Sequence, residues 1–147
     1  MNHTLRNVMS FIAGFVVGSL VNMGLIRLGY QVVAMPAGFD GSSQESFLAT
    51  AHLLQPINFL FPFLAHALGT FAGALVAYLM ASSQRALLAL GLGALTLVGG
   101  ILAAMMIPAP AWFIAADLLL AYLPMAWLAA RIGHRILAKR AASATNA

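Results

Sequence analysis

The chain has 147 residues, of which 63% are hydrophobic and only 7% are charged, with a formal net charge of +4 and a mean hydropathy of +0.96. Soluble domains are about 45–50% apolar and about 25% charged, so this composition excludes a soluble globular protein and indicates an integral membrane protein. The chain has no cysteine, which excludes disulfide bonds, thiolate metal sites and cysteine catalysis.

Four stretches are long and apolar enough to cross the hydrocarbon core of a bilayer, which takes about 20 mostly apolar residues. They cover residues 8–26, 59–80, 86–107 and 111–130. Tight turns join the second stretch to the third and the third to the fourth, so these helices are expected to be antiparallel neighbours. The sequence therefore predicts an all-α fold: one transmembrane domain with four helices in an antiparallel bundle.

The basic residues predict how this bundle is oriented. With four spans, both termini and the turn before the third span share one side of the membrane. That side holds six of the seven basic side chains: Arg6, Arg85, Arg131, Arg135, Lys139 and Arg140. Because basic residues accumulate on the cytoplasmic side, we expect both termini in the cytoplasm of a bacterial inner membrane. The basic tail, residues 131–147, lies directly beside a span, which favours contact with anionic lipid over nucleic acid.

The one long connection, residues 28–58, is expected on the outer side. Ser42 and Glu45 match the S-x-x-E capping box that begins a helix, and Pro56 follows the end of the same apolar pattern. These signals predict a short surface helix over residues 43–54. It is too short to span, so we expect it along the outer membrane surface or over the bundle.

Small residues in the first two spans predict close helix packing. Gly14 and Gly18 are four residues apart, as are Gly69 and Gly73. In lipid such stripes let backbones approach closely, and we expect packing within the chain rather than dimerisation. Pro124 is expected to soften or kink the fourth span, because proline has no N–H for the helical ladder.

Three polar side chains lie at similar depths within the spans. At a rise of about 1.5 Å per residue, Asn22, His66 and Asp117 are roughly 6, 10 and 9 Å inside the outer ends of the first, second and fourth spans. An aspartate facing lipid near the membrane centre costs about 2.5–3.5 kcal/mol, so pairing is favoured. We therefore expect a contact between Asp117 and His66, with Asn22 nearby, in a pocket open to the outer face.

The connection is expected to add polar groups to this pocket. Glu45 and His52 are seven residues apart and therefore share a helical face. Folded over the mouth of the bundle, they would lie above His66 and Asp117. Mixed histidine and carboxylate sets suit divalent metals, but the chain has no HExxH-type spacing. The sequence requires no cofactor, and a divalent metal stays an open alternative.

Three stretches carry a resemblance to a known group of proteins. They are residues 18–24 (GSLVNMG), 61–69 (FPFLAHALG) and 108–117 (PAPAWFIAAD). Through them the chain resembles uncharacterised small bacterial inner-membrane proteins with four helices. The resemblance implies location and architecture, and it transfers no functional residue.

These patterns favour three functions in turn. The first is an outward-facing intramembrane pocket that binds a small molecule, ion or lipid headgroup, within a transport or accessory component. Four spans are few for a complete transporter, so a homo-oligomer or a larger membrane partner is expected. The second is a membrane-embedded enzyme acting on a lipid-type substrate at the outer leaflet, with His66 and Asp117 as acid and base. The third is a non-catalytic assembly subunit that docks a partner through its glycine stripes.

Overall fold

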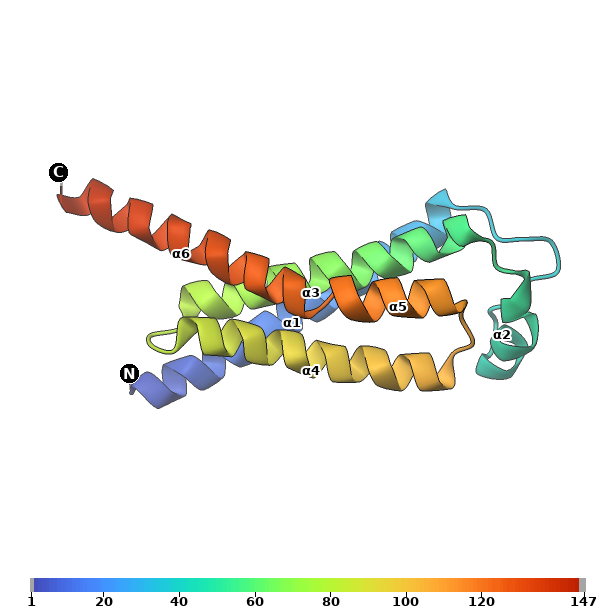
Figure 1. Ribbon diagram of the computed structural model, residues 1–147, viewed down its shortest axis with the longest axis horizontal. Helices are drawn as coiled ribbons and strands as arrows, with labels where there is room; N and C mark the ends of the chain where they lie inside the picture. The colour runs from blue at the N-terminus through green and yellow to red at the C-terminus, as the bar shows by residue number, and fades with distance from the viewer. Residues whose placement is uncertain (1, 146–147) are drawn as a thin grey trace.

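The computed structural model describes residues 2–145, which form helices joined by tight turns and one longer connection (Figure 1). The α-helices are α1 (His3–Val32), α2 (Gln44–Thr50), α3 (Leu60–Met80), α4 (Arg85–Met106), α5 (Ala111–Leu120) and α6 (Leu123–Thr145). Two short 3₁₀ helices, Ala51–Leu53 and Pro56–Phe59, lie between α2 and α3. Residues 2–145 contain no β-strand. The predicted all-α fold is therefore confirmed.

Four segments are long and apolar enough to cross a membrane: α1, residues 56–80, α4 and residues 111–145. The surface of the bundle is correspondingly apolar. Leu20, Met105 and Leu119 are 68%, 79% and 70% exposed. Apolar patches of this extent are rare on soluble monomers, and lipid is the environment that they fit. The chain is a multi-pass membrane protein.

The bundle has two different ends (Figure 1). At the terminal end, α1 begins, α6 ends, and residues 81–84 join α3 to α4. At the connection end, residues 33–59 link α1 to α3, and residues 107–110 link α4 to α5. The basic tail is helical as far as Thr145, where α6 ends, and α6 extends past the other helices at the terminal end.

The glycine stripes of α1 and α3 face each other. A Cβ atom on Gly14 would lie 2.5 Å from the carbonyl oxygen of Gly73, and one on Gly18 would lie 2.8 Å from that of Gly69. Only glycine permits backbones this close, as is common between membrane helices. The prediction that these stripes serve packing within the chain is confirmed.

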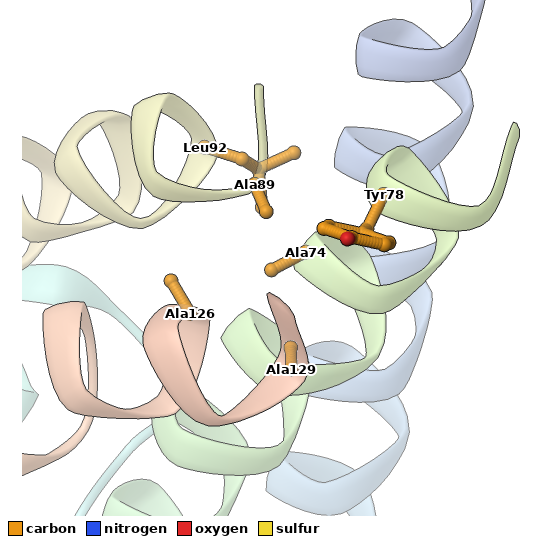
Figure 2. Close-up of a cluster of buried hydrophobic side chains, with 6 residues drawn as sticks. All are labelled: Ala74, Tyr78, Ala89, Leu92, Ala126 and Ala129. Atoms are coloured by element: carbon orange, nitrogen blue, oxygen red, sulfur yellow. The ribbon is translucent and has the colours of Figure 1, made fainter. Parts of the chain in front are cut away.

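A small apolar cluster joins α3, α4 and α6 (Figure 2). Its buried members are Ala74, Tyr78, Ala89, Leu92, Ala126 and Ala129. The alanines keep the helices close, and the Tyr78 ring packs against Gly133 of α6. This cluster fixes α6 against α3 and α4 on the terminal side of the break between α5 and α6.

The fourth membrane segment is two helices rather than the continuous span predicted over residues 111–130. α5 ends at Leu120 and α6 begins at Leu123. Pro124 explains the break, because its ring would clash with the carbonyl of Leu120 and it has no N–H to donate. In the first turn of α6 it needs no helical acceptor. The break leaves Tyr122 outside both helices.

The surface helix is shorter than predicted, and its cap is one residue further along the chain. α2 has seven residues, whereas the prediction covered residues 43–54. The N-cap is Ser43 rather than Ser42, because the Ser43 backbone is extended and its Oγ accepts the N–H of Ser46 at 3.0 Å. Glu45 is therefore in the first turn, where a negative charge favours the helix dipole, and not at the third position that a capping box requires.

Candidate functional site

An imidazole and a carboxylate from different helices meet inside the bundle. Nδ1 of His66, on α3, lies 2.8 Å from Oδ1 and 3.0 Å from Oδ2 of Asp117, on α5. Asp117 is only 4% exposed, and the His66 side chain is 26% exposed. The structure thus brings together the two residues that the sequence placed at similar depth. A contact with both carboxylate oxygens fixes the orientation of the imidazole ring.

Tyr122 adds a third group to this pair. Its hydroxyl donates a hydrogen bond of 2.8 Å to Oδ2 of Asp117. Its ring stacks on the His66 ring, with centroids 5.7 Å apart and an interplanar angle of 27°. Gly100 of α4 makes room for this tyrosine, because a Cβ atom there would overlap the Tyr122 hydroxyl. Helices α3, α4 and α5 and the break before α6 therefore all shape one site.

A second polar contact lies one helical turn along α3 from His66. The Thr70 hydroxyl donates to Oγ1 of Thr96 at 3.3 Å, and the Thr96 hydroxyl reaches the carbonyl oxygens of Leu92 and Gly93 at 3.1 and 3.0 Å. Both threonine hydroxyls are therefore hydrogen-bonded within the bundle, and neither is left free for a ligand.

The His66–Asp117 pair lies at the deep end of a cavity at the connection end of the bundle. The cavity volume is about 290 Å³. Its walls come from the ends of α1, α3, α4 and α5 that face the connection, and they are almost entirely apolar. The connection contributes six apolar side chains to the cavity lining: Val33, Met35, Phe39, Phe47, Leu54 and Phe59. The rings of Phe39 and Phe47 pack edge to face, with centroids 5.5 Å apart.

Asn58 links two parts of the connection by hydrogen bonds. Its Nδ2 donates to the carbonyl oxygen of Ala34 at 3.2 Å, and its Oδ1 accepts the N–H of Gln55 at 2.8 Å. The residue is buried and borders the cavity. Because its amide nitrogen and oxygen both form hydrogen bonds within the connection, the role of Asn58 is structural.

The other residues predicted for the site lie elsewhere. Asn22 sits between α1 and α3, where its backbone and Cβ face Gly69, and it does not border the cavity. Glu45 and His52 are exposed and also outside the cavity lining. The connection turns its phenylalanines inward and these polar side chains outward. The predicted grouping with His66 and Asp117 is therefore limited to those two residues.

No cluster of metal ligands accompanies the pair. Within residues 2–145, no group of three histidine or acidic side chains is arranged to hold a metal ion. His66 and Asp117 supply two such side chains, and the third group at the site is a phenol. The arrangement is one of hydrogen bonds among the three side chains.

Tyr122 and Gly100 are the site residues that sequence reasoning missed. Tyr122 is five residues after Asp117, which on a continuous helix would turn it away from the carboxylate. The signal that pointed to it was Pro124, two residues later, since a proline there predicts a break at this place. Gly100 belongs to a glycine pair in α4 whose two members the sequence does not distinguish.

Comparison with protein-family models, curated protein sequences and solved structures gives no match for this chain. Its function is therefore argued from the geometry of this site.

Proposed function

We propose that this protein is a binding component of a bacterial inner membrane, and that the cavity at the connection end takes a small molecule at the His66–Asp117 pair. The observation that carries the proposal is the position of this pair, at the deep end of a cavity with apolar walls. Pockets for small molecules usually combine apolar walls with a few placed polar groups.

The cost of these polar groups in a membrane supports the proposal. A buried aspartate is expensive in lipid, and intramembrane ionisable residues usually mark functional sites. The Asp117 carboxylate is hydrogen-bonded to two side chains, His66 and Tyr122. A role in packing alone would be met by apolar side chains with far less desolvation.

The arrangement also leaves one atom free for a ligand. When Nδ1–H of His66 donates to Asp117, Nε2 faces away from the carboxylate. Within residues 2–145, Nε2 makes no hydrogen bond. Nε2 is therefore the imidazole atom that remains available to a ligand in the cavity.

The proposed orientation follows the basic residues. Arg6, Arg85 and the basic residues of α6 lie toward the terminal end, which we place in the cytoplasm by the positive-inside rule. The cavity then faces the outer side. We propose that a second copy or a larger membrane protein completes a transport or accessory assembly, in line with the resemblance to small four-helix inner-membrane proteins.

Analysis of co-purified molecules tests the proposal. The wild-type protein, His66→Ala, Asp117→Asn and His52→Ala are purified in the same way, and organic extracts of each are compared by mass spectrometry. We expect at least one compound that is enriched with the wild type and with His52→Ala but is lost from both site variants. Identical extracts from all four proteins would contradict the proposal.

Acid–base catalysis is a second candidate function. A carboxylate that holds Nδ1 of a histidine and leaves Nε2 free has the geometry of a general base. The cavity lining includes no serine, threonine or cysteine, so a covalent mechanism through a hydroxyl or thiol of those residue types has no nucleophile there. Incubating the co-purified compound with the wild type and with Asp117→Asn distinguishes the two functions, since only catalysis changes the mass or structure of the compound.

The assembly alternative is narrowed to fewer glycines. The stripes of α1 and α3 are occupied within the chain, because Gly14 and Gly18 pack on Gly73 and Gly69. A partner that docks through glycine must therefore use another face, such as α4 at Gly99, where a Cβ atom would meet nothing within 4 Å.

A further inference from the structure

We infer that the ligand of this cavity is a neutral lipid with one hydroxyl group, a long-chain alcohol or a phenol, and that it binds with the hydroxyl at the deep end. This inference rests on the proposed binding function and specifies the chemical class of the ligand. It is carried by the charge, the polarity order and the size of the cavity.

The charges around the cavity leave no counter-ion for an anionic headgroup. No lysine or arginine borders it, so a phosphate or carboxylate would enter without a cation to pair with, at a high desolvation cost. Asp117 is 4% exposed, and both of its oxygens already accept hydrogen bonds. A ligand ammonium group would therefore meet the imidazole instead of a free carboxylate.

A hydroxyl matches the one polar atom that remains. Nε2 of His66 accepts a hydrogen bond when the imidazole is neutral and donates one when it is protonated. A hydroxyl group both donates and accepts, so it pairs with Nε2 in either state. The other polar groups of the lining do not compete, because Asn58 is used within the connection and Tyr30 lies at the exposed rim.

The order of polarity along the cavity is the reverse of that in a phospholipid. Phospholipid headgroups stay at the membrane surface, whereas here Phe39, Phe47 and Leu54 line the surface end and the polar pair lies at the inner end. Lipid tails are as apolar as these walls, so the walls alone do not distinguish a ligand from the bilayer. The hydrogen bond to His66 supplies that distinction.

The size of the cavity fits the hydroxyl end of a larger lipid. A volume of about 290 Å³ holds about ten non-hydrogen atoms at about 30 Å³ each. We place the remainder of the ligand between α1 and α4. Phe11 of α1 packs beside Gly91 of α4 near the terminal end, and the two helices diverge toward the connection end (Figure 1). Tyr30 of α1 and Ile107, which directly follows α4, both border the cavity and are exposed.

The test measures thermal unfolding of the full chain in nanodiscs of phosphatidylcholine and phosphatidylglycerol, whose headgroups all carry phosphate. The added probes are 1-decanol, 4-hexylphenol, decane, decanoate and decyltrimethylammonium, at equal mole fractions of the bilayer. Ala104→Leu reduces the cavity volume at a lining residue that is not part of the polar pair. Ala94→Leu is the matched control, because it makes the same change on an exposed face of α4 outside the cavity.

We expect a saturable rise in Tm of about 5 °C with 1-decanol or 4-hexylphenol, in the wild type and Ala94→Leu but not in Ala104→Leu. A larger rise with the phenol identifies an aromatic, phenolic ligand, and a larger rise with decanol identifies an aliphatic alcohol. Equal or larger rises with decanoate or the ammonium compound would overturn the hydroxyl inference and leave the binding function in place. Equal Tm shifts in all three proteins with every probe would show that the probes act on the bilayer alone, and they would overturn the hydroxyl inference. The comparison of co-purified molecules then decides the binding function separately.

Discussion

The hydroxyl of Tyr122 donates a 2.8 Å hydrogen bond to Oδ2 of Asp117 across the break between α5 and α6. The break and the site are therefore one feature. Pro124 interrupts the helix, the interruption frees Tyr122 from helical geometry, and the tyrosine reaches a carboxylate in the preceding helix. His66 approaches the same carboxylate from α3. Asp117 thus links two parts of the fourth membrane segment to the second.

Removing the tyrosine hydroxyl should weaken this link. Tyr122→Phe leaves Asp117 with one donor instead of two, and hydrogen bonds to charged groups are worth about 1.5–3 kcal/mol. We expect a loss of that size in the free energy of unfolding, measured by titration with SDS in mixed micelles. Tyr78→Phe is the control, because Tyr78 is buried but makes no side-chain hydrogen bond within residues 2–145. Equal losses in the two variants would contradict the assigned bond.

The adjacent glycines of α4 should respond in opposite ways to alanine. Nothing lies within 4 Å of a Cβ atom on Gly99, whereas one on Gly100 would overlap the Tyr122 side chain. Gly99→Ala should be neutral or stabilising by up to about 1 kcal/mol, since alanine favours helix. Gly100→Ala should destabilise the protein by about 1–3 kcal/mol and lose the co-purified compound. Tm measurements on both variants check the order, and a Gly100→Ala protein as stable as the wild type would speak against this packing.

The packing of α1 on α3 predicts a second pair of opposite results. A Cβ atom on Gly73 would lie 2.6 Å from the carbonyl oxygen of Gly14, but one on Gly24 meets nothing within 4 Å. Gly73→Ala should destabilise the folded monomer by more than about 1 kcal/mol, while Gly24→Ala should not. Unfolding of the monomer fraction is measured, because the contact lies within one chain. Loss of an oligomer with an unchanged monomer would place the Gly73 stripe at a subunit interface instead.

The exposed residues of the connection should be dispensable for binding. Glu45 and His52 lie outside the cavity lining. Glu45→Gln and His52→Ala should therefore leave both the co-purified compound and the metal content of the protein unchanged. Mass spectrometry of extracts and elemental analysis of the same samples check this. A stoichiometric metal that disappears in either variant would place these residues in a site that the geometry does not indicate.

The sequence was sufficient to predict the parts of the fold that follow from membrane physics. Apolar length predicted four spans, glycine spacing predicted close helix packing within the chain, and the cost of a buried carboxylate predicted that Asp117 would have a partner. Depth along each helix follows from a fixed rise per residue. The depths of His66 and Asp117 could therefore be compared before their contact was known.

Direction around each helix was harder to predict than depth. Asn22 continues the line of Gly14 and Gly18, and for that reason it faces the glycine stripe of α3 instead of the cavity. His66 is beside that stripe rather than on it, which turns its ring toward α5. Tyr122 could not be placed from periodicity at all, because it lies in a break where helical periodicity does not apply.

The ¹⁵N spectrum of the His66 ring tests the central claim most directly. The protein is labelled with ¹⁵N-histidine in nanodiscs, and the His66 signals are assigned by their loss in His66→Ala. The account predicts a protonated, slowly exchanging Nδ1 that becomes mobile in Asp117→Asn, while the exposed His52 averages between its two tautomers in both proteins. A His66 ring that exchanges freely and resembles His52 in the wild type would show that no carboxylate holds it, and the proposed site would be wrong.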